Sequence, residues 1–349
     1  MHSTPIAYKI ATCRNRFTAT RYLLFSGILL LVSCQSNLPY QQNQGEIFKT
    51  SYSIKYQYGK SLQDEIEDKL HQFDLSLNPF NPQSIISKIN NNEPVVPDSF
   101  FLNLLHRSME ISHKTDGKFD ITVSPFINAW GFGFNNMENV TQAMIDSLKL
   151  FVGYDKISVT PDGNIVKADP RLQLNASAIA KGYACDVVGN LLESYGIKNY
   201  LVEIGGEIVA KGVNKERACW RIGIDKPIDD ISGTQHELQT RLSLCNKALA
   251  TSGNYRNYYV KDGKKYAHTI DPDTGYPAET DILSATVIAD DCMTADAYAT
   301  AFMTMGMEES IATANKLPGI SYYFIYHKPD DTYGIIYSEG FERFMMDAR

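Results

Sequence analysis

The segment that most constrains how this chain can fold runs from Asn175 to Asp186 and reads Asn-Ala-Ser-Ala-Ile-Ala-Lys-Gly-Tyr-Ala-Cys-Asp. Ser177 is expected to cap a helix, because the residues that follow repeat an apolar side chain every four positions. That stripe is Ile179, Tyr183, Val187 and Leu191. Small side chains let a ligand approach the backbone, and Lys181 adds a positive charge where the free N–H groups of a helix start favour an anion. The segment predicts a seat for phosphate or pyrophosphate, although many helix starts rich in Ser and Ala are purely structural.

A second helical pattern places Asp296 and Thr300 four residues apart, and therefore on one face of a helix. A carboxylate, a hydroxyl and a backbone carbonyl together form a hard oxygen site suited to Mg²⁺, with positions left for phosphate oxygens. Taken alone, the pair is more simply explained by an aspartate near a helix start and a threonine bonded to its own helix.

Composition excludes one class of partner and says little about redox chemistry. The formal net charge is −7, and no basic stripe is interleaved with aromatic residues, which argues against nucleic-acid binding. The six cysteines form no C-x-x-C pair and no cluster with His at zinc spacing. Four of them are predicted to be small buried hydrophobic residues: Cys185, Cys219, Cys245 and Cys292.

The N-terminus has the features of an export signal. Three arginines precede a short apolar run, which ends in Leu31-Val-Ser-Cys34 and is too short to span a bilayer. The tetrad looks like a bacterial lipobox, in which Cys34 becomes the lipidated first residue; an ordinary signal peptide or a cytosolic protein with an apolar start are the alternatives. We expect a lipoprotein signal peptide at 1–33 and a flexible tether at 34–45. The protein would then be lipid-anchored in the bacterial cell envelope and face the periplasm.

The remainder of the chain mixes strands and helices without a regular alternation. Strands are predicted at 52–58, 200–204, 208–210, 220–224, 242–244 and 285–289, with a closing hairpin at 320–327 and 334–337. Helices are predicted after a capping Ser61, from about 99 to 114, after Ala178 and around Asp296. This order favours an α+β fold over a doubly wound parallel sheet. With no repeat and no linker after Gly45, we expect a single large catalytic domain at 46–345, with two lobes around a cleft.

Three further motifs point to one family. They are Gly117-Lys-Phe-Asp-Ile-Thr-Val-Ser-Pro125, Trp130-Gly-Phe-Gly133, and the stretch from Ala250 to Pro277, which contains a hairpin turn at Asp262-Gly263. With the two helical motifs, they make the chain resemble the ApbE-type FAD:protein FMN transferases from about Gly45 to about Ser338. The resemblance implies an α+β domain with mixed or antiparallel sheets and flanking helices. It also implies a reaction, in which FMN is cut from FAD and joined through its phosphate to a Thr or Ser hydroxyl of an exported acceptor protein, with release of AMP.

The resemblance also assigns roles to individual residues. Asp296, Thr300 and the backbone carbonyl of Ala178 would hold Mg²⁺, and Lys181 would hold a phosphate oxygen. His268 would take a proton from the acceptor or bond to the nucleotide, and together with Asp296 it is the predicted catalytic pair. Contacts to FAD are assigned to Phe48, Phe80, Lys118, Phe119, Asp120, Asn175, Lys181, His268 and Ile270.

Some of these positions depart from the family pattern or have simpler explanations. Asn175 stands at a usually acidic position, where an amide keeps an acceptor and adds a donor. Phe80 stands where many members carry Tyr, and Phe48 where many carry Met; core packing explains both equally well. A satisfied buried histidine is the structural alternative for His268, and a salt bridge is the alternative to phosphate binding for Arg256.

Two other functions are compatible with the same residues. One is Mg²⁺-dependent hydrolysis of FAD to FMN and AMP, in which water replaces the acceptor hydroxyl. The other is a lipoprotein that binds and delivers flavin without chemistry. A metal seat at Asp296 and Thr300 favours an enzyme over a carrier, because a carrier has no need of a metal at the pyrophosphate.

Overall fold

The computed structural model describes residues 38–133, 140–227, 237–254, 258–261, 264–330 and 332–346. Tyr40–Arg349 form one compact unit. Within the described ranges, no helix has the length and hydrophobicity needed to cross a membrane. Cys34, Arg256 and the predicted turn at Asp262-Gly263 lie outside the described residues.

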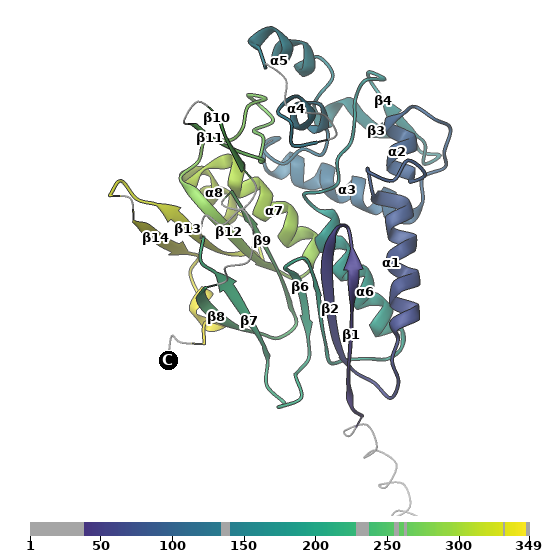
Figure 1. Ribbon diagram of the computed structural model, residues 1–349, viewed down its shortest axis with the longest axis vertical. Helices are drawn as coiled ribbons and strands as arrows, with labels where there is room; N and C mark the ends of the chain where they lie inside the picture. The colour runs from purple at the N-terminus through teal and green to yellow at the C-terminus, as the bar shows by residue number, and fades with distance from the viewer. Residues whose placement is uncertain are drawn as a thin grey trace, which may run out of the picture. The chain divides into compact units, whose positions relative to one another are not determined.

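An eight-stranded sheet forms the centre of this unit (Figure 1). Its spatial order is β1 (Tyr40–Ile47), β2 (Thr50–Gln57), β5 (Tyr200–Ile204), β6 (Glu207–Lys211), β9 (Lys247–Gly253), β12 (Ile282–Ala289), β13 (Ser321–His327) and β14 (Tyr333–Tyr337). Every neighbouring pair of these strands is antiparallel. The predicted α+β fold with antiparallel sheets is therefore confirmed, and β13–β14 is the predicted closing hairpin.

The described helices are α1 (Gln63–Leu77), α2 (Ile85–Asn90), α3 (Ser99–Lys114), α4 (Ser124–Ala129), α5 (Gln142–Lys149), α6 (Ala180–Ser194), α7 (Cys292–Met305) and α8 (Met307–Ala314). Helices α1, α3, α6 and α7 share the large core on one face of the sheet, whereas α4 and α5 pack into a separate small core and lie above the sheet in Figure 1. Short 3₁₀ turns occur at Tyr154–Lys156 and Phe341–Phe344. The predicted helix from 99 to 114 is confirmed at both ends, with the Asp98 carboxylate accepting a hydrogen bond from the N–H of Phe101.

Alternation along the strands separates two cores. On β13, Tyr322 and Phe324 join the large core beneath the helices, whereas Tyr323 and Ile325 join a smaller core on the opposite face. A two-stranded ribbon, β7 (Trp220–Asp225) and β8 (Leu238–Leu244), covers that opposite face. Two further small hairpins are β3 (Ile157–Val159) with β4 (Ile165–Lys167) and β10 (Tyr258–Lys261) with β11 (Lys264–Ala267).

The predicted helix caps were wrong in two places. Helix α6 has Ile179 at its N-cap position and no side-chain cap, because the residues around Ser177 form a turn in which the Asn175 Oδ1 accepts the Ser177 N–H at 2.9 Å. Helix α1 has Leu62 at its N-cap position, one residue after the predicted Ser61, although the Ser61 hydroxyl accepts the N–H of Gln63 at 3.3 Å. The apolar periodicity placed both helices correctly, whereas the capping residues depended on turn geometry.

The predicted tether also differs from the structure in its second half. Tyr40–Gly45 belong to β1 and pair with β2, with Gly45 opposite Tyr52. The polar side chains of this stretch find partners within the fold, since the Tyr40 hydroxyl donates to the carbonyl of Val213 at 2.7 Å. A polar edge strand lacks the apolar alternation by which a strand is recognised in a sequence.

Candidate functional site

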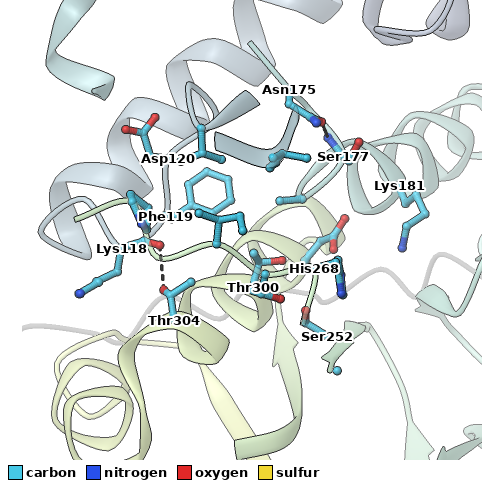
Figure 2. Close-up of a pocket in the computed structure, with 18 of the residues that line it drawn as sticks. Lys118, Phe119, Asp120, Asn175, Ser177, Lys181, Ser252, His268, Thr300 and Thr304 are labelled. Atoms are coloured by element: carbon cyan, nitrogen blue, oxygen red, sulfur yellow. Dashed lines mark hydrogen bonds between the residues drawn. The ribbon is translucent and has the colours of Figure 1, made fainter. Parts of the chain in front are cut away.

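A cavity of about 280 Å³ lies where the start of α6, helix α7 and the neighbouring ends of β6 and β9 meet the segment after β11 (Figure 2). All the predicted nucleotide and metal contacts except Phe48 and Phe80 line this cavity: Lys118, Phe119, Asp120, Asn175, Ala178, Lys181, His268, Ile270, Asp296 and Thr300. The fold thus brings together residues from four separate sequence motifs. The cavity is the candidate active site.

Helices α6 and α7 come close together at Gly182 and Asp296, and we call this side of the cavity its floor. Gly182 donates its N–H to Asp296 Oδ2 at 2.9 Å. A Cβ atom at Gly182 would lie 2.3 Å from the carbonyl oxygen of Cys292 and 2.7 Å from the Cβ of Asp296, so only glycine allows this packing. One turn further along α6, the Asp186 carboxylate accepts the N–H groups of Cys292 and Met293 at 2.9 and 2.8 Å. Helix α6 therefore fixes the start of the helix that carries Asp296 and Thr300.

The donor set at this floor fits a hard cation. Asp296 is 5% exposed, and the Gly182 N–H engages only one of its carboxylate oxygens. Burial raises the pKa of Asp296, while Lys181 and the Gly182 N–H oppose that effect. A buried carboxylate favours a cation beside it. In the described part of the chain, no three His, Cys, Asp or Glu side chains gather as a metal site, so a cation here would rely on Asp296 together with Thr300 and the Ala178 carbonyl.

Glu207 is the residue of the site that the sequence reasoning missed. It begins β6, lines the cavity, and forms an ion pair with Lys181 through Oε1. Its side chain is 3% exposed, and burial raises its pKa, whereas Lys181 lowers it. Burial by itself would lower the pKa of Lys181, but Glu207 and Asp296 outweigh it and raise the pKa above its ordinary value. The sequence contains one signal for it: Glu207 is the charged residue between Gly205-Gly206 and the apolar residues of the following strand.

The tripeptide Lys118-Phe-Asp120 lines the cavity, but its charged groups already have partners. The Lys118 ammonium lies 3.2 Å from Asp271 and 2.8 Å from Asp273. Asp120 accepts backbone N–H groups with both oxygens, from Thr122 at 2.7 Å and from Tyr154 at 2.9 Å. Burial raises the pKa of Asp120 to about 6, and those N–H groups limit the rise. These side chains shape the cavity wall, and their contact with FAD stays a prediction.

His268 and Ile270 lie on the segment that follows β11. The His268 ring packs edge-on against Phe132, with centroids 6.5 Å apart. Ile270 is 5% exposed and forms an isolated bridge with Pro277. The Trp130 indole N–H donates to the carbonyl of Gly275 at 2.9 Å, so the motif from Trp130 to Gly133 holds this segment in place.

Phe48 and Phe80 lie in a neighbouring cavity instead. This second cavity, of about 270 Å³, shares Ser177 and Lys181 with the first. Phe48 and Lys49 form the turn between β1 and β2, both with positive φ, at 53° and 60°. The Lys49 ammonium lies 5.2 Å from the centroid of the Phe80 ring. Residues other than Gly, Asn and Asp are strained in this conformation, and such strain is concentrated at functional sites.

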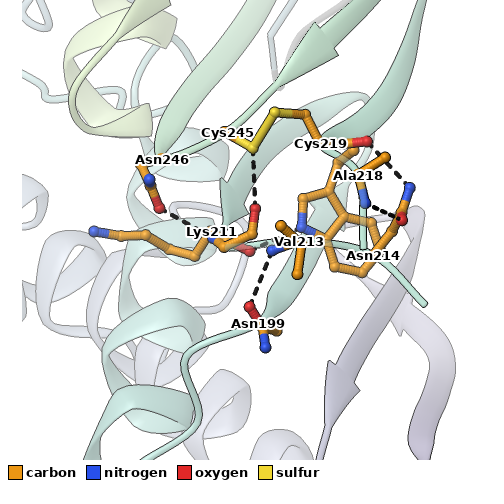
Figure 3. The surroundings of a disulfide bond; sticks show 10 residues. Asn199, Lys211, Val213, Asn214, Ala218, Cys219, Cys245 and Asn246 are labelled. Carbon is orange, nitrogen blue, oxygen red and sulfur yellow. Dashed lines mark hydrogen bonds between the residues drawn. A yellow bond between two sulfur atoms is a disulfide. The ribbon is translucent and has the colours of Figure 1, made fainter. Parts of the chain in front are cut away.

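Two cysteines outside the cavity contradict their sequence interpretation. Cys219 and Cys245 form a disulfide, with Cα atoms 5.0 Å apart (Figure 3). The sequence analysis predicts small buried hydrophobic residues here, whereas both cysteines are half-buried and are joined across 26 residues of sequence. The antiparallel pairing of β7 and β8 brings them together. Trp220 pairs with Leu244, and the two cysteines are the neighbours of these residues along the chain. Cys185 and Cys292 are buried and free, as predicted.

Comparisons with known proteins match the chain to one family. A family model described as the ApbE family matches residues 48–324. The chain is 36% identical to an FAD:protein FMN transferase of Vibrio cholerae serotype O1, over 92% of this chain and 97% of that protein. It is 32% identical to the FAD:protein FMN transferase of Escherichia coli K12, over 82% and 83%.

Solved structures resemble this fold over most of its length. The flavin transferase ApbE from Vibrio cholerae superposes with a TM-score of 0.78 at 34% identity, covering 88% of this chain and all of that one. The apo form of the Pseudomonas stutzeri flavinyl transferase ApbE gives a TM-score of 0.78 at 29% identity, covering 87% and 96%.

Proposed function

The chain belongs to the ApbE family and is an FAD:protein FMN transferase, and from this premise we propose that the 280 Å³ cavity is where FMN is transferred. The observation that carries the proposal is the convergence of Lys181, Asp296, Thr300 and His268 on one cavity from distant parts of the chain. The start of α6 suits a pyrophosphate, because the positive end of the helix dipole and the Lys181 ammonium both favour anions.

In the proposed reaction, the hydroxyl oxygen of an acceptor Thr or Ser attacks the phosphorus of the FMN half of FAD. The bond between that phosphorus and the bridging oxygen breaks, and AMP departs with the electron pair. His268 lines the cavity and would accept the hydroxyl proton. Lys181 would hold a phosphate oxygen in place, because phosphoryl transfer depends mainly on positioning and on neutralising charge.

We propose that Mg²⁺ assists this step, held by Asp296, Thr300 and the Ala178 carbonyl. Bound there, the ion would offset negative charge on the phosphates. Asp296 supplies the only carboxylate of that ligand set. The hydrogen bond from the Gly182 N–H holds this carboxylate at the floor of the cavity.

The decisive experiment uses the soluble chain with FAD, Mg²⁺ and an exported protein that carries the family's flavinylation motif, Asp-Gly-x-Ser/Thr-Gly-Ala-Thr. We expect the acceptor to gain the mass of FMN less water, with release of one AMP per flavin attached. Equal consumption of FAD with and without acceptor, and no covalent flavin, would support hydrolysis to FMN and AMP instead. Intact FAD that stays tightly bound would support a delivery lipoprotein.

The proposed metal seat predicts the behaviour of Asp296→Ala. We expect turnover to fall by at least a hundredfold and to lose its dependence on Mg²⁺, because the strongest ligand of a hard cation is gone. Steady-state rates measured across a Mg²⁺ titration test this. The control is Asp290→Ala. Asp290 is exposed, lies just before the same helix, and forms an ion pair with Lys247. Near-normal activity of Asp296→Ala at low Mg²⁺ would place the metal elsewhere.

We further propose that the enzyme is a lipoprotein anchored through Cys34 and working on the periplasmic side of the envelope. The tetrad ending at Cys34 supports this proposal, and so does the Cys219–Cys245 disulfide, because disulfides persist in oxidising compartments outside the cytoplasm. FAD and the acceptor protein would then both have to be available outside the cytoplasm.

A further inference from the structure

Glu207 is a buried carboxylate that uses only one of its two oxygens. Oε1 accepts the ammonium of Lys181, while Oε2 is buried and makes no hydrogen bond to any described residue. Burying a carboxylate oxygen without a donor lowers stability, and native folds rarely keep such an atom without a reason. We expect the reason to be the ion pair between Oε1 and Lys181, because both side chains line the active-site cavity.

The surrounding backbone is built to hold these two side chains together. Gly205 and Gly206 form the turn between β5 and β6, with φ of 62° and 101°, and so place Glu207 at the first position of β6. A Cβ atom at Gly205 would lie 2.9 Å from Thr50 and 3.4 Å from the Lys181 side chain, which shows how closely that lysine passes the turn. From α6, the Cys185 thiol donates to the Glu207 carbonyl at 3.2 Å.

We propose that Glu207 is a positioning residue, which holds the Lys181 ammonium where negative charge develops on the phosphates during FMN transfer. This inference rests on the proposed role of Lys181 as the phosphate contact. The Lys181 side chain is 32% exposed and flexible, so without a fixed partner its ammonium would sample many positions. A donor held in advance at the place of developing charge stabilises the transition state more than a mobile one does.

The same carboxylate has an opposite effect on binding. Glu207 is negatively charged close to the seat of a negatively charged pyrophosphate, so it weakens the attraction of Lys181 for bound FAD. The pair therefore contributes orientation more than affinity, which is the condition under which an interaction raises kcat and not merely binding. Loss of Glu207 should separate these two quantities.

The chain offers a matched control on the other side of the same turn. Glu203 lies on β5 opposite Ile208, two residues before the Gly205-Gly206 turn, and it does not line the active-site cavity. Glu203→Gln also removes one carboxylate close to the Gly205-Gly206 turn, but it leaves the contact between Lys181 and Glu207 in place.

The test compares Glu207→Gln, Lys181→Met, the double variant and Glu203→Gln in the flavinylation assay, with the Kd for FAD measured by flavin fluorescence. We expect Glu207→Gln to lower kcat by tenfold or more while the Kd for FAD changes by less than threefold or becomes tighter. The double variant should be no slower than Lys181→Met alone, because Glu207 acts through Lys181. Glu203→Gln should match the wild type.

Two outcomes would overturn the inference alone: a slow Lys181→Met with a Glu207→Gln that keeps a normal kcat, or effects that multiply in the double variant. Normal turnover by Lys181→Met would overturn the proposed role of Lys181, and the inference with it. Thermal unfolding of each variant shows whether it is folded. If Glu207→Gln fails to fold, Glu207→Asp replaces it: the charge stays but is withdrawn by one methylene, so positioning predicts a lower kcat and a wild-type kcat would exclude it.

Discussion

Gly182 shows how one residue without a side chain can decide the geometry of a metal seat. Its Cα faces the start of α7 so closely that a methyl group would overlap the carbonyl of Cys292 and the Cβ of Asp296. We expect Gly182→Ala to push the two helices apart, to lower the free energy of unfolding by about 1–3 kcal/mol and to reduce turnover sharply. Denaturant unfolding and the flavinylation rate measure these two effects.

The control for this change lies on the same helix. Gly189→Ala also adds a methyl group to α6, but it meets only the Tyr200 side chain, 3.0 Å from its hydroxyl oxygen, and neither residue lines the cavity. Turnover of Gly189→Ala should stay close to that of the wild type. If both alanine variants lose activity equally, helix α6 is sensitive to any substitution and the contact with Asp296 is not special.

At the scale of elements, the junction of α6 and α7 contains a buried carboxylate whose titration is linked to stability. Burial raises the pKa of Asp186 to about 7, and the N–H groups of Cys292 and Met293 oppose the rise. Between the unfolded pKa near 4 and pH 7, the folded protein holds a proton that the unfolded chain has lost. The free energy of unfolding should therefore fall as pH rises through this window, by at most about 4 kcal/mol from this group.

Asp186→Asn should flatten this dependence, because an amide does not titrate. We expect the slope of unfolding free energy against pH between 4 and 7 to be smaller in the variant than in the wild type, as measured by urea unfolding. The amide also offers only one acceptor to two N–H groups, so the variant should be less stable at pH 4.5. Asp162→Asn, an exposed change in the β3–β4 turn, is the control; an equal slope in wild type and Asp186→Asn would contradict the linkage.

We expect the Cys219–Cys245 disulfide to contribute to the stability of the β7–β8 ribbon. Replacing both Cys219 and Cys245 by Ser should lower the free energy of unfolding by about 3 kcal/mol, because the bond closes a loop of 26 residues. Neither cysteine lines the active-site cavity, so turnover of the folded variant should be unchanged. Dithiothreitol should destabilise the wild type and leave the double variant unaffected; an equal response of both would assign the effect to another group.

For the molecule as a whole, the lipobox-like tetrad that ends at Cys34 predicts a membrane anchor. If Cys34 carries the lipid, Cys34→Ala should release the protein from the membrane fraction or leave the precursor uncleaved, while the flavinylation activity of the extracted protein persists. Fractionation of cells, followed by mass spectrometry of the N-terminus, measures both outcomes. An unchanged membrane fraction with an unchanged N-terminus would show that Cys34 is not the anchor.

The sequence alone determined where the helices and the local motifs lie, because periodicity and local motifs depend on neighbours in the chain. Apolar spacing located α3 and α6. The motifs around Lys118, Lys181 and Asp296 were correctly predicted to contain site residues, and all three residues line one cavity. The family resemblance added the reaction, which the comparisons confirm.

Only the tertiary structure decided the contacts between segments far apart in the chain. Glu207 reaches Lys181 because the Gly205-Gly206 turn faces the start of α6, and Cys219 reaches Cys245 because β7 pairs with β8. The same holds for β1, whose polar residues become a strand only beside β2. Such partners leave no periodic trace in the sequence, since the free energy that joins them comes from packing across the fold and not from the propensity of either segment.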